Sequence, residues 1–103
     1  MTEKFRKLVE SNIQLLPIPE IETHFVFERD GFAALVERRQ NDFGKIGTAG
    51  LLHDKGVAPL IWRNEAPIFV AKGFEQPATP EQVQQLRAFQ NDLTAALTST
   101  MSV

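Results

Sequence analysis

The sequence predicts one α+β domain, a five-stranded antiparallel sheet of meander type flanked by an N-terminal and a C-terminal helix. Three observations lead to this fold class. Strand-like segments follow one another across short turns, the first and last segments carry apolar residues at helical spacing, and 103 residues suffice for a single domain. The predicted order is α-β-β-β-β-β-α over residues 1–103, and residues 98–103 are expected to fray.

The N-terminal segment has the spacing of an amphipathic helix, which we predict over residues 3–16. The stripe along this helix consists of Phe5, Leu8, Val9, Asn12 and Leu16. Pro17 and Pro19 follow, and proline lacks an amide hydrogen and disfavours helical geometry in the residue before it. The helix is therefore expected to end at Pro17, and residues 16–20 are expected to be extended.

The clearest structural signal is a β-hairpin. Two strand-like segments, 23–29 and 32–38, flank the dipeptide Asp30-Gly31, which favours the type I′ turn whose twist matches that of paired strands. A two-residue loop fixes the register. On one face this register pairs Phe27 with Ala34 and Phe25 with Val36; on the other it pairs Val26 with Leu35 and His24 with Glu37. The face with the larger apolar side chains is the predicted core face.

Three further strands are predicted over residues 46–53, 57–63 and 67–72. Residues 40–45 read as a loop, residues 53–56 as a three-residue hairpin loop with a bulge, and residues 64–65 as a short turn. Pro59 conflicts with a central position for the fourth strand, because proline cannot donate to a strand ladder. We therefore expect a bulge or local fraying at Ala58-Pro59.

The C-terminal helix has the best-defined start in the sequence. Thr79 is a suitable N-cap, Pro80 occupies the first helical position, and Gln82 stands three residues after the cap, as in a capping box. The helix is predicted to run to about Leu97. Its apolar stripe consists of Val83, Leu86, Phe89, Leu93 and Leu97.

Composition excludes several classes of function. The net charge is −2 and no basic stripe is visible, which argues against nucleic-acid binding and against binding to a membrane surface. No apolar stretch has the length of a signal peptide core or a membrane span. The sequence has no cysteine and no tyrosine, so a thiol nucleophile, a thiolate metal site and a tyrosine acid are excluded. A cytoplasmic protein without a cofactor is the expectation.

The two histidines, His24 and His53, are the candidates for acid–base catalysis, with Glu37 as a partner carboxylate. The alternative is structural: His24 pairs with Glu37 across the hairpin, and His53 opens a turn. Neither histidine stands at a known metal-ligand spacing, so no metal site is predicted.

The segment from Gly44 to Gly50 is the candidate ligand site. Its glycines, together with Lys45, Gly47 and Thr48, could present backbone amides and a cation to an anion. It differs from a P-loop because Ile46 stands where serine or threonine would follow the lysine. A small cofactor-free enzyme, such as an isomerase, or a small-molecule sensor would have its pocket here. The competing interpretation is that the glycines permit close packing.

The second face of the sheet carries more apolar residues than a fully solvated face requires. Val26, Leu35, Trp62 and Arg63 are the candidate interface residues, since exposed apolar patches mark interfaces and Trp and Arg are enriched at their centres. The favoured hypothesis is a non-enzymatic protein-interaction or ligand-binding module that acts as a homodimer. Its partner is a second copy of the chain or another protein.

Overall fold

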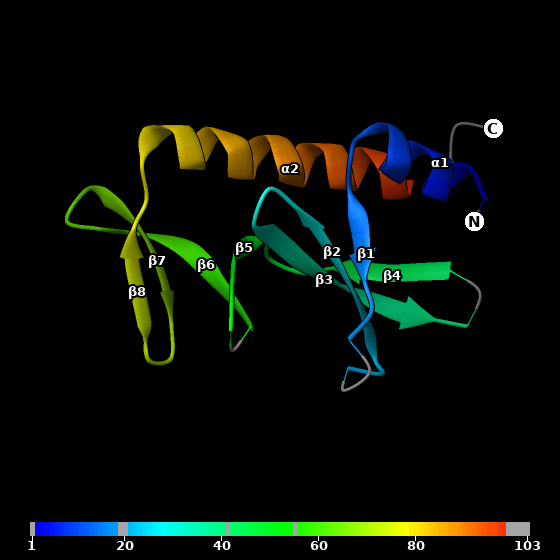
Figure 1. Cartoon of the computed structure of the whole chain (residues 1–103), viewed down its shortest axis with the longest axis horizontal. Helices are drawn as coiled ribbons and strands as arrows, with labels where there is room; N and C mark the ends of the chain where they lie inside the picture. Colours follow the sequence, from blue (N-terminus) through cyan, green and yellow to red (C-terminus); the bar gives the residue numbers. More distant parts are fainter. Residues whose placement is uncertain (1, 19–20, 41, 55, 99–103) are drawn as a thin grey trace.

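The computed structural model describes residues 2–18, 21–40, 42–54 and 56–98. It is an α+β fold in which two terminal helices cover one face of an antiparallel sheet (Figure 1). The elements are α1 (Thr2–Glu10), β1 (Gln14–Leu16), β2 (His24–Arg29), β3 (Phe32–Arg39), β4 (Asp42–Ile46), β5 (Gly50–His53), β6 (Gly56–Arg63), β7 (Ala66–Ala71), β8 (Phe74–Pro77) and α2 (Pro80–Thr98). Of the predicted frayed tail, Thr98 belongs to α2, and residues 99–103 lie outside the described residues.

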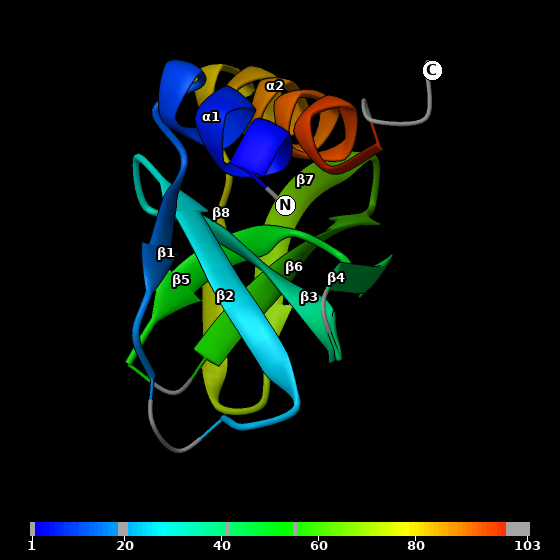
Figure 2. The same ribbon diagram turned by 90° about the vertical axis from the view of Figure 1, so that its right-hand side faces the viewer.

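The sheet corrects the predicted strand number. It has eight strands instead of five, in the order β1-β2-β3-β5-β6-β7-β8, with β4 paired to β3 off this path. It curls into a half-barrel, which the end-on view makes visible (Figure 2). The three strands that the sequence did not predict are β1, β4 and β8. They are short: β1 falls at the end of the predicted helix, β4 falls largely in the predicted loop of residues 40–45, and β8 falls in a segment for which no element was predicted.

The predicted β-hairpin is confirmed in full. β2 pairs with β3 in the predicted register, from His24 opposite Glu37 to Phe27 opposite Ala34. Asp30 and Gly31 have φ values of 53° and 89°, so both turn residues have the positive φ of a type I′ turn. Phe27, Ala34 and the other residues of the predicted core face belong to or pack against the buried core, which confirms the face assignment.

Pro59 marks a change of strand partner instead of the predicted bulge or fray. Residues 56–59 of β6 pair with β5, where Gly50 lies opposite Pro59. Residues 60–63 pair with β7, where Leu60 lies opposite Phe69. The strand therefore passes from one neighbour to the next at the residue that cannot donate to a ladder. At the β5–β6 turn, His53 pairs with Gly56, which leaves two residues between them instead of the predicted three-residue loop.

Two of the unpredicted strands form where a longer neighbouring strand offers them an edge: β4, in the predicted loop of residues 40–45, and β8, in a segment without a predicted element. Residues 42–46 form β4 because β3 extends beyond the end of β5 and offers its far half to a second partner, from Val36 opposite Ile46 to Arg39 opposite Asp42. After β7, Gly73 adopts a φ of 75°, and the chain turns back to pair as β8, with Ala71 opposite Phe74. Glycine accepts this conformation without the steric cost of a side chain.

The C-terminal helix agrees closely with the prediction. Gln82 N donates to Thr79 Oγ1 at 3.0 Å, and Thr79 N donates to Gln82 Oε1 at 2.9 Å, so the capping box is complete. All five residues of the predicted stripe are buried, and four of them, Leu86, Phe89, Leu93 and Leu97, belong to the core cluster that contains Phe27, Phe69 and Leu8. In Figure 2, α1 lies beside α2 above the same face of the sheet. Neither helix has the length and apolar content needed to cross a bilayer, among the residues described.

Candidate functional site

An apolar groove of about 780 Å³ opens between α1, β1 and the end of β2. Its floor includes the core residues Leu8 and Phe27, and its rim includes Phe5, Val9 and Leu15. β1 is the terminal strand of the sheet, and in Figure 2 it stands at the edge of the molecule and runs downward from the end of α1. The groove therefore lies at the outer edge of the core, between the short helix α1 and the terminal strand of the sheet.

The groove depends on an early end to α1, which corrects the predicted helix of residues 3–16. Asn12 has a φ of 60°, Ile13 N donates to Leu8 O at 2.9 Å, and Asn12 N donates to Val9 O at 3.0 Å. These two bonds form a Schellman motif, and asparagine tolerates its left-handed position better than most residues. Ile13 and Leu8 are both buried in the core, as the motif's usual apolar contact requires.

After this turn the chain reverses and runs as β1. Leu15 lies opposite Phe27 in the pairing of β1 with β2, and residues directly opposite in a ladder point to the same face. Leu15 therefore projects from the helix-facing side of the sheet, at its outer edge. Because β1 is the last strand and α1 is short, Leu15 forms one rim of the groove and α1 forms the other.

Exposure distinguishes this groove from the rest of the surface. Among the described residues, five large apolar side chains are exposed, and three of them line this groove: Phe5 at 38%, Val9 at 72% and Leu15 at 42%. The other two, Ile61 and Trp62, lie next to each other on β6. The groove is therefore the main gathering of exposed large apolar side chains on the described part of the chain.

An ion pair between Arg29 and Asp92 lies at the inner end of the groove. Arg29 Nη1 donates to Asp92 Oδ2 of α2 at 2.8 Å and to Ser11 O at 2.9 Å, and its guanidinium lies 5.7 Å from the ring centre of Phe89. This one side chain connects β2 to α2 and to the turn after α1. The contacts of Arg29 thus hold β2, α2 and the turn after α1 together at the inner wall of the groove.

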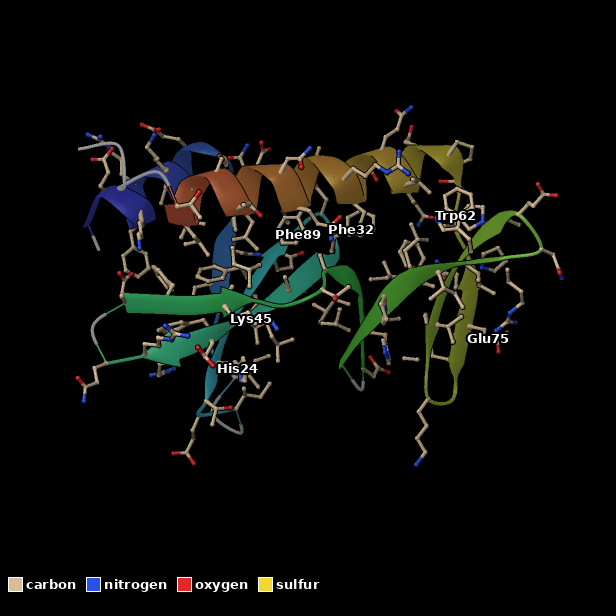
Figure 3. The ribbon with its side chains drawn as sticks, turned by 180° about the vertical axis from the view of Figure 1, so that it is seen from behind. His24, Phe32, Lys45, Trp62, Glu75 and Phe89 are labelled. Carbon is tan, nitrogen blue, oxygen red and sulfur yellow. The ribbon has the colours of Figure 1, made fainter. Side chains whose placement is uncertain are left out.

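The candidate catalytic histidines line different cavities. His24, labelled in Figure 3, has its Nδ1 2.8 Å from Thr23 Oγ1, and it lines a cavity of about 220 Å³ with Val26. His53 stacks on Phe74, with ring centres 4.5 Å apart, and lines another cavity of about 360 Å³. Within the described residues, no three His, Asp or Glu side chains form a group that could hold a metal ion.

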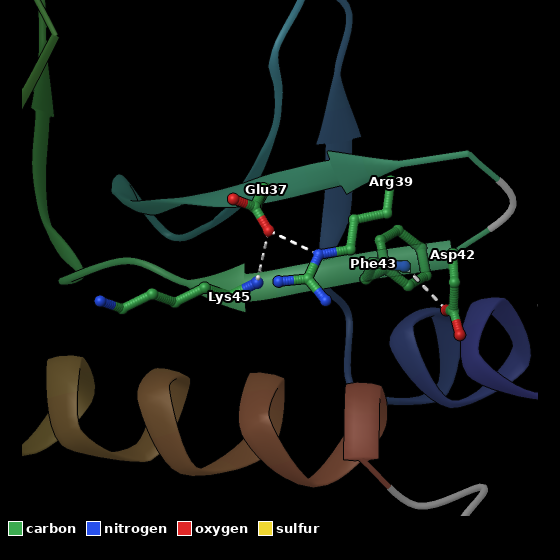
Figure 4. A network of polar contacts seen from close by, with 5 residues as sticks. All are labelled: Glu37, Arg39, Asp42, Phe43 and Lys45. Atoms are coloured by element: carbon green, nitrogen blue, oxygen red, sulfur yellow. Dashed lines mark hydrogen bonds and ion pairs between the residues drawn. The ribbon is translucent and has the colours of Figure 1, made fainter.

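Glu37, the third candidate catalytic residue, belongs to a surface network (Figure 4). Arg39 Nε donates to Glu37 Oε1 at 2.7 Å, and Lys45 N lies 3.5 Å from the same oxygen. These two hydrogen bonds, the arginine's first, lower the pKa of Glu37. A general base that works near neutral pH needs a pKa close to that pH, so the shift of Glu37 runs in the direction opposite to the one catalysis favours.

The glycine-rich segment is divided between two structural roles. Gly44 and Lys45 lie in β4, and residues 47–49 connect β4 to β5. Gly47 N donates to Leu35 O at 2.8 Å, so this amide, like that of Lys45, points to a protein oxygen. A cavity of about 300 Å³ is lined by Gly47 and Thr48 against α2, and Lys45 is not among its lining residues. The structure thus brings two of the three candidate ligand residues together.

Gly50 shows the need for close packing that was the alternative interpretation of these glycines. A Cβ atom at Gly50 would lie 2.2 Å from Ala58 O on the paired strand β6. Backbone cannot move away as a flexible side chain can, so a larger residue would separate β5 from β6.

The candidate interface residues do not form one patch. Val26 is buried at 3% exposure and Leu35 is partly buried. Trp62, labelled in Figure 3, is 57% exposed and lies on the same face of β6 as Leu60. Leu60 in turn lies opposite the core residue Phe69 of β7. Trp62 therefore belongs to the helix-facing side of the sheet and not to the face of Val26. Arg63 Nη1 donates to Glu75 Oε1 at 3.2 Å.

Sequence reasoning overlooked the groove because it assigned Phe5, Val9 and Leu15 to one continuous helix. Asn12 was the signal that could have located it, since asparagine followed by an apolar residue is a frequent helix terminator. Comparisons of the chain with protein-family models, curated proteins and solved structures find no match. The geometry of the groove therefore carries the functional argument.

Proposed function

We propose that this chain is a non-enzymatic protein-interaction module and that its binding site is the groove between α1 and β1. The observation that carries the proposal is the gathering of Phe5, Val9 and Leu15, three of the five exposed large apolar residues, around one groove. Contiguous exposed apolar surface is unfavourable in water and usually marks an interface.

The shape of the groove favours a protein segment over a small molecule. Small-molecule pockets enclose most of their ligand, whereas this groove is open along its rim, where Val9 is 72% exposed. A partner that covers such a rim must itself be broad, as the apolar side of a helix or of a sheet is. The absence of cysteine from the sequence suits the reducing cytoplasm, which we retain as the proposed location.

Selection from a random-peptide display library on immobilised protein tests the proposal. We expect enrichment of apolar peptides, and we expect Leu15→Glu to weaken their binding at least about tenfold, because a carboxylate would have to be buried against the partner. Ile61→Glu is the matched control, since Ile61 is an exposed strand residue of similar exposure outside the groove. Selected peptides that bind Leu15→Glu as tightly as the unaltered chain would contradict the proposal.

A further inference from the structure

The hydrogen-bond pattern of the β2–β3 hairpin determines which backbone groups of β2 point toward β1. In a two-residue hairpin the residues that flank the turn exchange hydrogen bonds, and every second pair along the ladder does the same. Arg29 and Phe32 flank this turn, and the bond of 2.9 Å from Arg38 N to Thr23 O fits the same alternation. Phe27 lies two residues before Arg29, so its N–H and C=O point to β3 and away from β1.

The backbone of Leu15 consequently points outward. Leu15 lies opposite Phe27 in the pairing of β1 with β2, and because Phe27 uses its N–H and C=O on β3, these two residues exchange no hydrogen bond. Gln14 and Leu16 are the residues of β1 that exchange bonds with β2. The N–H and C=O of Leu15 therefore face the open edge of the sheet, where β1 is the terminal strand (Figure 2).

This edge differs from the other open edges in the described part of the chain. β4 pairs only with β3 and carries the charged residues Asp42 and Lys45, while β8 pairs only with β7, carries Glu75 and ends at Pro77. Charged residues and proline on an edge strand discourage pairing with another chain. β1, which consists of residues 14–16, has neither. Its edge is therefore the one that the sequence leaves open to a further strand.

A strand added beside β1 would also place a side chain in the groove. The added residue opposite Leu15 would point to the same face as Leu15, where Phe5 and Val9 form the other rim. One extended segment could thus pair with the backbone of Leu15 and contact the apolar rim. A helix would cover the same rim but leave the N–H and C=O of Leu15 without partners when water is displaced, which is unfavourable.

We infer that the partner of the groove binds as an extended apolar segment of another protein, which joins the sheet as a strand beside β1 and inserts a side chain between Leu15 and α1. This inference rests on the proposed function. Of the two partner shapes that fit the groove, the apolar side of a helix or of a sheet, the open backbone of Leu15 selects the strand. Because β1 has only three residues, the new ladder is short, and the side chain in the groove must supply much of the affinity.

Removal of the Leu15 amide hydrogen tests the inference, with peptides selected on the unaltered chain as probes. Proline lacks this hydrogen and is tolerated on an edge strand whose N–H faces outward. We expect Leu15→Pro to bind the peptides at least about tenfold more weakly than Leu15→Val, which keeps the amide and a side chain of similar size. Glu75→Pro makes the same change on β8, where the alternation also turns the amide outward, and should bind as the unaltered chain does.

Amide hydrogen exchange, measured by NMR on the unaltered chain, provides a second readout that needs no variant. Peptide binding should slow exchange at Leu15 at least about tenfold, because its N–H becomes part of a ladder. Exchange at Glu75, the outward amide of the opposite edge, should not change. Far-ultraviolet circular dichroism shows whether each proline variant is folded.

The outcomes separate this inference from the proposed function. Equal binding of the selected peptides by Leu15→Pro and Leu15→Val overturns the inference and indicates a helical or other partner, while the proposed function stands. If Leu15→Pro does not fold, unchanged exchange at Leu15 in the peptide complex overturns the inference in the same way. A library from which no peptide is selected contradicts the proposed function, and the inference with it.

Discussion

The β2–β3 hairpin and the α1–β1 unit contribute to the same face of the sheet, yet they use apolar residues differently. In the hairpin, Phe27, Ala34 and Val36 are almost completely buried. In the α1–β1 unit, Phe5, Val9 and Leu15 remain exposed around a groove. The hairpin is covered on this face by the helices, whereas α1–β1 stands at the outer edge. Apolar side chains in the first region therefore stabilise the fold, whereas those in the second remain partly in contact with solvent.

The largest contrast should appear when phenylalanine is truncated in each region. Phe27→Ala should reduce the free energy of unfolding by about 3–5 kcal/mol, because it removes a fully buried ring and leaves a cavity. Phe5→Ala, the matched variant in the groove, should cost clearly less, since Phe5 is 38% exposed. Urea denaturation followed by tryptophan fluorescence measures both. Equal losses would mean that the groove is as much a part of the stabilising core as the hairpin.

A smaller effect is expected at the turn that separates α1 from β1. Asn12→Ala should lower the free energy of unfolding by about 1 kcal/mol, because alanine disfavours the left-handed conformation that Asn12 adopts, with φ 60°. Asn12→Gly is the control and should retain or increase stability, since glycine is the preferred residue at this position. If glycine proved as harmful as alanine, a role of the Asn12 side chain itself would be indicated, and the conformational explanation would be wrong.

The ion pair that joins α1 to β4 should make the stability of the fold depend on pH. Lys4 Nζ donates to Asp42 Oδ1 at 2.7 Å, and this hydrogen bond, followed by that from Phe43 N, lowers the pKa of Asp42. A carboxyl whose pKa is lowered by folding stabilises the fold above its unfolded pKa. That contribution is lost as the pH falls through the folded value.

Asp42→Asn should therefore have a lower melting temperature than the unaltered chain at pH 7, and the difference should disappear near pH 2, where both side chains are uncharged. Calorimetry across this range measures it. Asp54→Asn is the control carboxylate for which no such loss is expected. A difference that persisted unchanged at pH 2 would exclude the Lys4–Asp42 pair as its cause.

The smallest effect on stability is expected in the groove itself. Val9→Ser should change the free energy of unfolding by less than about 0.5 kcal/mol, because Val9 is 72% exposed. The same substitution should weaken any association through the groove. Chemical denaturation of the chain without a partner, at protein concentrations too low for self-association, measures the effect on stability separately from the effect on association. A large loss of monomer stability would place Val9 in the core of the folded chain.

Local turn chemistry explains which elements could be predicted from the sequence. Asp30-Gly31 and the Thr79-Pro80 start of α2 each dictate one backbone geometry, so the hairpin register and the helix start were predicted correctly. At Asn12 a helix terminator competed with an apolar stripe that continued beyond it. Periodicity favoured the longer helix, although tertiary pairing of Leu15 with β2 determines the outcome.

The remaining errors have a common physical cause. β4 and β8 are polar or short, and they become strands because β3 and β7 offer them an edge. Such long-range pairing leaves little trace in local composition. For the same reason, the spacing of His24 and His53 in the sequence did not reveal that they line separate cavities. The groove, which is formed by residues on three elements, could be found once the position of β1 was known.

The exchange of partners along β6 has a mechanical consequence. Because β6 pairs with β5 before Pro59 and with β7 after it, the sheet consists of two ladders joined end to end through a single backbone. A joint of this kind can twist without breaking the hydrogen bonds of either ladder, so we expect the sheet to resist torsion least at this point. α2 lies across both ladders (Figure 1), and we expect its packing against them to resist the twist. We expect fraying of α2 to loosen both halves of the sheet together, so that their unfolding is coupled through this helix.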